Sequence, residues 1–208
     1  MTPLAKNPAA IISPIPLDPP VINAFFPLIL NNFKSKGKKV ISYGDFYFQN
    51  QYLLASYSDE IILNPFGLVY LEGYKNYRFY LKEALNKIDV NINTFIAGDY
   101  KSAAEIFTNS SMSEDSKKES ERFLTSLWEK WKLVVSNNRN TKLSINIQNY
   151  IDDIGNLMSN SNKKGSNLAT DFGLVDSIMN RSDMEEYIFN ITNNKKEYFL
   201  NFYEYIQV

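Results

Sequence analysis

Apolar residues follow two different spacings along the first half of the chain, and each spacing predicts a different element. Apolar positions three or four residues apart predict helices at residues 21–36, 48–57 and 74–87. Short apolar runs bounded by turn residues predict buried strands at residues 39–43, 61–63, 68–71 and 92–97. Strands that alternate with helices over short connections are typical of an α/β fold.

Glycine and proline mark several boundaries of these elements. Gly37 is expected to end the first helix, and Pro27 to kink that helix or mark its true start. The Asn-Pro-Phe-Gly sequence at residues 64–67 predicts a turn between two strands. Near residue 173, a glycine is expected to end a late helix, after which Leu174 and Val175 return to the core.

The third quarter of the chain has a different character. Ser113 followed by two acidic residues is a good helix N-cap, and a helix of about 25 residues is expected to follow it. The apolar side of this helix is predicted to comprise Phe123, Leu124, Leu127, Trp128, Trp131, Leu133 and Val134. The two tryptophans are interpreted as core or subunit contacts and not as a ligand cage. Asparagine-rich segments at residues 137–149 and 156–164 are predicted to be loops.

Proline is concentrated at the beginning of the chain, where seven of the eight prolines lie within the first 27 residues. Neither a helix nor a central strand tolerates this density, so residues 1–20 are predicted to be an extended, weakly ordered arm. Within that arm, residues 10–17 are a poor version of a strand. Residues 21–197 are predicted to form a single α/β domain, and residues 198–208 a tail.

Composition restricts the chemistry. The chain has 208 residues, of which 44% are hydrophobic and 22% charged, and its net charge is −1. This balance gives no reason to expect binding to nucleic acid. Cysteine and histidine are both absent, which excludes disulfides, thiolate catalysis, the usual Cys/His zinc sites and a histidine-assisted serine mechanism. Lysine and carboxylates are left as the acid–base groups, and no cofactor or metal motif is apparent.

The sequence Gly-Asp-Tyr-Lys-Ser-Ala-Ala-Glu at residues 98–105 contains the main candidate for catalysis, Lys101. It follows the predicted strand at residues 92–97 and opens a helix, so Lys101 is expected at a strand–helix junction. Accompanying motifs lie at residues 58–65, 67–69, 112–113, 137–139 and 173–176. Together these motifs resemble the amino-terminal half of the long-form signal peptide peptidases (SppA, protease IV), a family of serine–lysine peptidases.

The resemblance implies a partial crotonase/Clp-protease-like sheet with flanking helices, and a general-base role for Lys101. In the family the serine nucleophile belongs to the carboxy-terminal half, which implies a nucleophile-bearing partner half, signal peptides as substrates and a homo-oligomeric enzyme. It also implies association with the inner membrane on its periplasmic side. The longest apolar stretches, at residues 9–12 and 24–30, fall far short of the about 20 residues that span a bilayer. Because neither the family's membrane anchor nor a signal peptide is recognisable, we expect a fragment truncated at both ends.

A lysine acts as a base only when it is neutral. Its ordinary pKa is about 10.4, and a decrease of about three units corresponds to about 4 kcal/mol, which requires a desolvated site. Tyr100 and Phe107 are suitable apolar neighbours, whereas Asp99 and Glu105 would oppose the shift if they pointed at the amine. By itself, a lysine at a helix start is usually a solvated surface charge, so the functional reading depends on the resemblance.

Gln49 stands where the catalytic half of the family has its serine, at the start of a helix that follows a strand. An amide has no hydroxyl to activate, so this position cannot supply a nucleophile. Alternatively, Gln49 is simply a polar residue at a helix start. Ser102 adjoins Lys101, and neighbouring residues on a helix diverge by about 100°, so the two are not expected to form a dyad.

The carboxylates outside these motifs have no metal-binding spacing and are predicted to be solvated; they are Asp152, Asp153, Asp176, Glu185 and Glu186. Two other functions remain open. The chain could be an inactive structural or oligomerisation remnant of a split or decaying protease gene, which its prolines, asparagines and missing anchor suggest. A crotonase-like acyl-CoA enzyme is a weaker alternative, because no glycine-rich oxyanion turn or acidic dyad is apparent.

Overall fold

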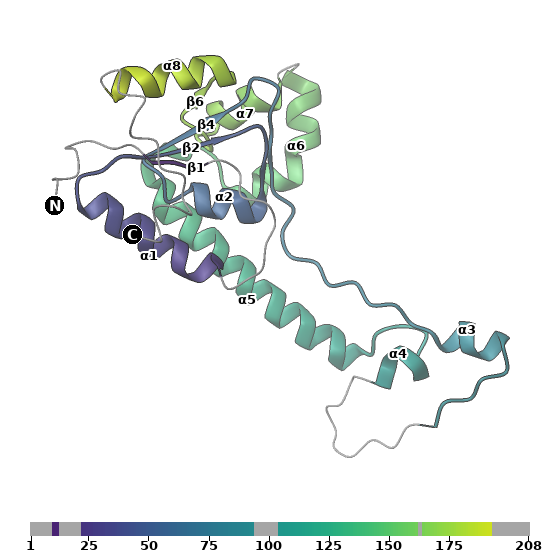
Figure 1. Cartoon of the computed structure of the whole chain (residues 1–208). Coiled ribbons are helices and arrows are strands. Elements are labelled where there is room, and N and C mark those ends of the chain that lie inside the picture. The colour runs from purple at the N-terminus through teal and green to yellow at the C-terminus, as the bar shows by residue number, and fades with distance from the viewer. Residues whose placement is uncertain (1–9, 13–21, 94–103, 162–163, 193–208) are drawn as a thin grey trace. The chain divides into compact units, whose positions relative to one another are not determined.

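The computed structural model describes residues 10–12, 22–93, 104–161 and 164–192 (Figure 1). They belong to two compact units. Unit 1 comprises the described residues up to Glu72 and those from Lys132 onward, and unit 2 comprises the described residues from Gly73 to Trp131. Lys101, the prolines at positions 14–20 and the tail at residues 198–208 lie outside the described residues. The assignment of residues 1–20, 21–197 and 198–208 as arm, single domain and tail therefore stays a prediction.

A four-stranded parallel sheet forms the centre of unit 1. Its strands lie in the order β1 (Ala10–Ile12), β2 (Val40–Gly44), β4 (Glu60–Leu63) and β6 (Ser177–Ile178). All three neighbouring pairs are parallel. A separate parallel pair is formed by β3 (Tyr47–Phe48) and β5 (Val69–Tyr70). This arrangement confirms the predicted α/β class, and β1 falls within the stretch that the sequence marked as a poor strand.

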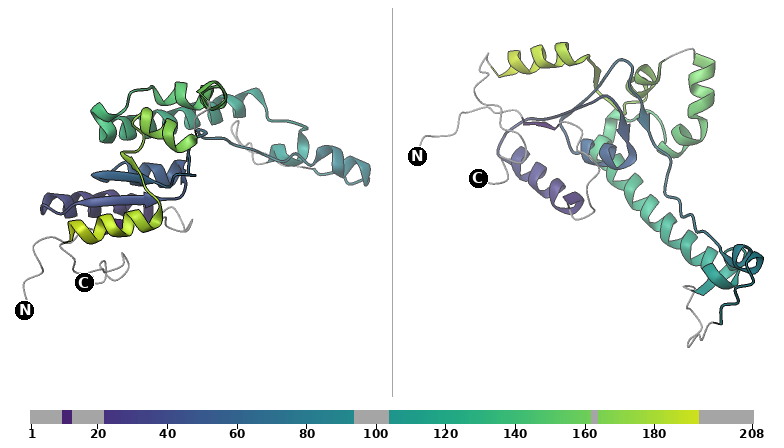
Figure 2. Two further views of the ribbon diagram at one scale, coloured as in Figure 1. Left: turned by 90° about the horizontal axis from the view of Figure 1, so that it is seen from above. Right: turned by 45° about the vertical axis from the view of Figure 1, so that its right-hand side comes forward.

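Helices cover both faces of the four-stranded sheet, with α8 on one face and α1 and α2 on the other (Figures 1 and 2). The helices assigned wholly to unit 1 are α1 (Ile22–Ser35), α2 (Gln49–Ala55), α6 (Ile147–Ser161), α7 (Gly165–Asp171) and α8 (Arg181–Ile191). Met184 and Ile188 of α8 pack against Ile41, Tyr43 and Ile62 of the sheet. Because both faces are covered, β2 and the apolar part of β4 are buried, as is usual for parallel strands.

The predicted turns and helix ends of unit 1 are confirmed. Gly37 follows α1 with φ +72° and Gly173 follows α7 with φ +71°, a backbone conformation that favours glycine. Pro27 lies inside α1, in its second turn. In the turn at residues 64–67, the Gly67 amide donates to the Asn64 carbonyl over 2.8 Å. Leu174 and Val175 are buried, as expected.

The prediction of a helix over residues 74–87 is wrong for its first part. Residues 74–81 have no regular structure, and only α3 (Lys82–Lys87) is helical. Tyr77 and Phe79 are 82% and 88% exposed, so neither side chain packs into a core in the described part of the chain. Without such packing, aromatic residues favour a helix only weakly. Ile92 also lies outside any strand, and residues 94–97 are not described.

The asparagine-rich segments predicted as loops are largely helical. Helix α5 (Glu114–Arg139) extends into the first segment, a short 3-10 helix, η2 (Asn140–Lys142), follows it, and α6 covers Ile147–Ser161. Asparagine lowers the intrinsic preference for a helix only modestly. In α6, Ile147 and Tyr150 are buried at helical spacing, and this packing outweighs the asparagines.

Helix α5 confirms the predicted N-cap and length. The Ser113 hydroxyl accepts a hydrogen bond from the Ser116 amide over 3.3 Å, and the helix has 26 residues. Its predicted apolar side is only partly buried, because Trp131 is buried while Phe123, Leu127 and Leu133 are exposed. Trp128 and Trp131 stack with their ring centroids 4.8 Å apart. They therefore contact each other, as the prediction of a packing role requires.

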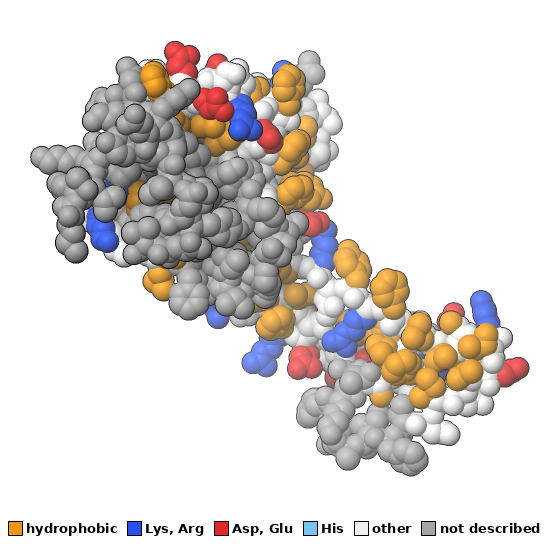
Figure 3. Space-filling view, viewed as in Figure 1, with side chains coloured by type: hydrophobic (Ala, Val, Ile, Leu, Met, Phe, Trp, Pro, Cys, Tyr) orange, Lys and Arg blue, Asp and Glu red, His pale blue; other side chains and the backbone are white. Residues whose placement is uncertain are grey.

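Unit 2 contains α3, α4 (Glu105–Thr108) and the first part of α5. The Leu81 amide donates to the Ile106 carbonyl over 2.7 Å and joins the segment before α3 to α4. Among the described residues of this unit, only Ser116 and Trp131 are buried. Figure 3 shows hydrophobic side chains gathered on the surface near α3 and α4. In the described part of the chain, no helix has the length and apolar character needed to cross a membrane.

Candidate functional site

Lys101, the predicted base, lies outside the described residues, and its role stays a prediction. The structure does describe the last two residues of its motif, Ala104 and Glu105, and the chain that follows them. This segment begins at Ala104 and continues as α4, in which the Thr108 hydroxyl donates to the Ala104 carbonyl over 3.1 Å. Its first helical residue is Glu105.

The Glu105 carboxylate is bonded to the beginning of α5. Its Oε1 atom accepts hydrogen bonds from the hydroxyl of Ser113 over 2.5 Å and from that of Ser116 over 2.9 Å. Its Oε2 atom accepts from the Ser113 amide over 3.4 Å. The Ser113 hydroxyl above all, with Ser116 and the nearby Arg78 guanidinium, lowers the pKa of the Glu105 carboxyl. Glu105 is therefore an ionised carboxylate directed at the N-terminus of α5, a favourable position for a negative charge.

Gln49 is the first residue of α2, directly after β3. Its Oε1 atom accepts a hydrogen bond from the Glu72 amide over 3.3 Å. Two residues later, Gln51 accepts from the Phe48 amide over 3.1 Å and completes the helix start. The Gln49 side-chain amide is thus hydrogen-bonded to the backbone. This contact agrees both with a position that replaces the family's serine and with an ordinary polar residue at a helix start.

The residues before Gln49 are held by the turn between β4 and β5. The Asn64 amide donates to the Gly44 carbonyl over 3.0 Å, and its side-chain Nδ2 donates to Asp45 Oδ1 over 2.9 Å. A methyl group at Gly67 would overlap the Asp45 carbonyl oxygen, so only glycine allows this close approach. The motif at residues 64–67 therefore fixes the chain that leads into α2.

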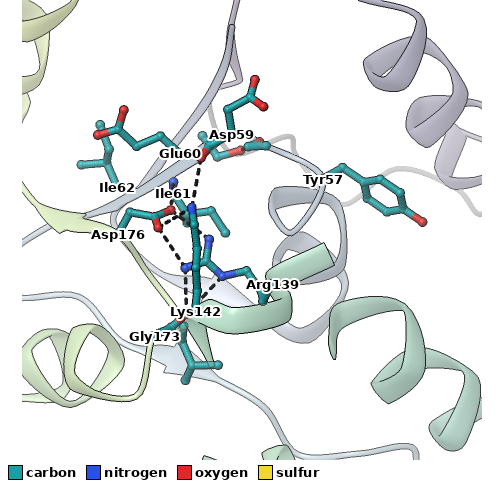
Figure 4. A network of polar contacts seen from close by, with 12 residues as sticks. Tyr57, Asp59, Glu60, Ile61, Ile62, Arg139, Lys142, Gly173 and Asp176 are labelled. Atoms are coloured by element: carbon teal, nitrogen blue, oxygen red, sulfur yellow. Dashed lines mark hydrogen bonds and ion pairs between the residues drawn. The ribbon is translucent and has the colours of Figure 1, made fainter. Parts of the chain in front are cut away.

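A buried ion pair joins the end of α5 to the segment before β6 (Figure 4). The Arg139 side chain is 2% exposed, and its Nη1 donates to Asp176 Oδ2 over 2.9 Å. Its Nε and Nη2 donate to the Gly173 carbonyl over 3.1 and 2.7 Å. Asp176 also accepts from the Ile61 amide over 2.8 Å, and it forms an ion pair with Lys142 over 2.7 Å.

The prediction that Asp176 is solvated is therefore wrong. Burial by itself would raise the pKa of this carboxyl, but hydrogen bonds from Arg139, Lys142 and the Ile61 amide more than compensate, and the pKa is lowered. Asp152, Asp153, Glu185 and Glu186 are exposed, as predicted. A signal for this ion pair was present in the sequence, because Arg139 is the last residue of the motif at 137–139 and Asp176 the last residue of the motif at 173–176. The sequence does not show that these two motifs lie next to each other in the fold.

The described residues contain no cluster of three or more aspartate or glutamate side chains arranged to hold a metal ion. Residues 32–186 match the family model of peptidase family S49. The chain belongs to peptidase family S49. This membership confirms the resemblance that the motifs indicated, and the parallel sheet agrees with the fold expected from it.

Two curated relatives extend the comparison with family S49. Protease 4 of Haemophilus influenzae is 38% identical over 160 residues, and Protease 4 of Salmonella typhi is 34% identical over 160 residues. In both cases the match covers 76% of this chain and 25% of the relative. The chain thus spans about a quarter of the length of these proteases, and family S49 relates it to peptidases of the serine type.

Proposed function

We propose that this chain supplies the general base, Lys101, of a serine–lysine endopeptidase that degrades cleaved signal peptides. The observation that carries the proposal is the match to peptidase family S49, which extends from residue 32 to residue 186 and so includes Lys101 with its motif. Because the chain contains no histidine and no cysteine, a lysine is the natural base for a serine nucleophile here.

In the proposed chemistry, Lys101 accepts and returns one proton in acylation and a second one in deacylation. The neutral amine accepts the proton of a serine hydroxyl while the serine oxygen bonds to the peptide carbonyl carbon. The resulting ammonium returns that proton to the leaving nitrogen when the peptide C–N bond breaks. In deacylation the lysine accepts a proton from water while the water oxygen bonds to the acyl carbon, and it returns that proton to the serine oxygen as the ester C–O bond breaks.

In this proposal the serine comes from a nucleophile-bearing carboxy-terminal half, outside residues 1–208. Gln49 supports that assignment, because its amide occupies the helix start after β3 and accepts a bond from the Glu72 amide. Two serines close to the Lys101 motif, Ser113 and Ser116, are engaged with the Glu105 carboxylate. The working enzyme is proposed to be a homo-oligomer at the periplasmic side of the inner membrane, as the family resemblance implies.

The test is to co-express the chain with the serine-bearing half of a family S49 peptidase, isolate the complex and measure hydrolysis of a fluorogenic peptide against pH. Wild type is expected to show a rate that rises through the lowered pKa of the lysine. Lys101→Met removes the base, and Lys101→Arg keeps a permanently protonated group, so both are expected to abolish hydrolysis. Lys118→Met, which alters an exposed lysine of α5, is the matched control and is expected to be active.

Two outcomes would contradict the proposal. If Lys101→Arg keeps the wild-type rate and pH profile, another residue is the base. If a folded, isolated complex of wild-type chain and serine half hydrolyses no peptide, the alternative of an inactive oligomerisation remnant is favoured instead.

A further inference from the structure

Glu105 has more hydrogen bonds than its place on a four-residue helix requires. Within the described part of the chain, its carboxylate accepts from three donors, all of them in Ser113 and Ser116 at the N-terminus of α5. The Ser113 hydroxyl has a double role, because it donates to Glu105 and accepts from the Ser116 amide as the helix cap. The Glu105 carboxylate and the N-cap of α5 are therefore joined in one hydrogen-bond network through the Ser113 hydroxyl.

This cluster also contains a buried residue of unit 2. Ser116 is one of only two buried residues among the described residues of that unit. Charged pairs elsewhere on the same helix are different, since Lys117 and Glu114 form an exposed pair one turn apart. In a unit with so little apolar burial, hydrogen bonds to a carboxylate have a larger share in fixing the backbone.

Glu105 follows Lys101 by four residues. If the function proposed above is correct, the Lys101 amine must be held within hydrogen-bond reach of a serine from the nucleophile-bearing half, and the backbone that follows it must be fixed. We propose that Glu105 is a positioning residue for Lys101, which anchors the end of the lysine motif to the N-terminus of α5. In this role its carboxylate accepts from Ser113 and Ser116, and no ion pair with the lysine amine is required.

The competing role is an ion pair between Glu105 and Lys101. A carboxylate beside the amine would raise the pKa of the lysine and work against its use as a base. Glu105→Gln separates the two roles, because glutamine keeps an oxygen that accepts from both serine hydroxyls but has no charge. Among the described residues, the Arg78 guanidinium also acts on the Glu105 carboxylate, so each variant is also made in an Arg78→Gln background, which removes this contribution.

The first measurement uses the complex of the chain with the serine-bearing half. Glu105→Ala is expected to lower kcat on the order of tenfold to a hundredfold, with KM and the midpoint of the pH profile unchanged, because small displacements of a catalytic group are costly. Glu105→Gln is expected to retain most of the activity with the same midpoint. The double variant Ser113→Ala/Ser116→Ala should lower kcat to the same extent as Glu105→Ala. Combining all three substitutions should cause little further loss of kcat. Glu119→Ala, at an exposed position of α5, is the control.

The second measurement does not depend on activity. Hydrogen exchange of the purified chain is followed in peptides that cover residues 104–108. Glu105→Ala is expected to accelerate exchange there and in the first turn of α5, whereas Glu105→Gln and Glu119→Ala are not. Unchanged exchange in Glu105→Ala would overturn the positioning role even if no complex were active.

The kinetic results also keep the two proposals apart. Loss of activity in Lys101→Met together with full activity in Glu105→Ala would overturn only the role of Glu105. A midpoint that moves to lower pH in Glu105→Gln, with a higher rate at neutral pH, would assign Glu105 to an ion pair with the lysine. Activity that survives Lys101→Met would instead overturn the proposed function.

Discussion

At the scale of single residues, the polar contacts of this chain hold backbone segments in place. Arg139 shows this most clearly, since a guanidinium that is almost fully buried donates both to a carboxylate and to the Gly173 carbonyl. Removing one partner of a buried ion pair leaves an unpaired charge, which is more costly than the pair itself is favourable. The energetic cost of mutation should therefore depend strongly on burial.

Arg139→Met is expected to lower the free energy of unfolding by about 3 kcal/mol or more, because Asp176 and the Gly173 carbonyl lose their main donor. Arg181→Met removes the exposed ion pair of Arg181 with Glu185 and is expected to cost less than about 1 kcal/mol. Urea unfolding of the purified chain, followed by circular dichroism, measures both. Equal effects of the two substitutions would show that the buried network does not stabilise the fold.

The lowered pKa of Asp176 predicts a dependence of stability on pH. Its ordinary value is 3.8, and the folded protein holds it below that value. The folded state therefore releases this proton more readily than the unfolded state, and the stabilisation is present above pH 3.8 and lost as the pH falls through the folded-state pKa. The difference in unfolding free energy between wild type and Asp176→Asn should shrink on acidification from pH 6 to pH 3. A difference that stays constant would contradict the assignment.

At the scale of elements, the sequence was most informative where one kind of signal dominated. The apolar runs at β2 and β4 predicted buried strands, and Ser113 predicted the beginning of α5, because burial and capping act locally. Residues 74–81 and α6 were mispredicted for opposite reasons. The aromatic residues Tyr77 and Phe79 suggested a helical face, but both are exposed in the structure. The asparagines of α6 suggested a loop, although Ile147 and Tyr150 form a buried helical face.

Two glycines with nearly the same backbone conformation allow the effects of conformation and contact to be separated. Gly37 and Gly173 have φ of +72° and +71°. A methyl group at Gly37 meets no atom within 4 Å, whereas one at Gly173 would overlap the backbone carbonyl of Lys142.

Gly37→Ala is expected to cost about 1–2 kcal/mol of unfolding free energy, the penalty for a left-handed residue with a side chain. Gly173→Ala is expected to cost considerably more, because the backbone at Lys142 must move and the Arg139 bonds to the Gly173 carbonyl are disturbed. Urea unfolding of both variants is the measurement. Similar costs for the two would mean that the chain around Lys142 adapts without loss.

At the scale of the whole molecule, the two units differ in how they are stabilised. Unit 1 has a covered parallel sheet with buried strands, whereas the described part of unit 2 has few buried residues and many exposed apolar ones. The candidate site was only partly predictable for the same reason. The Lys101 motif is a local pattern that the sequence displays directly. The bonds of Glu105 to Ser113 and Ser116, and of Arg139 to Asp176, depend on how the chain turns between the partners, which no local pattern encodes.

The last prediction concerns the chain by itself, which is expected to have no peptidase activity. A serine–lysine mechanism requires a serine hydroxyl with a neutral amine in reach, and the helix start at Gln49 provides an amide instead. The purified chain should neither hydrolyse a fluorogenic peptide nor react with a fluorophosphonate probe. After addition of the serine-bearing half, labelling should occur on that half, and Lys101→Met should abolish it. Labelling of any serine in the isolated chain would show that residues 1–208 carry their own nucleophile, and the assignment of the nucleophile to the carboxy-terminal half would have to be abandoned.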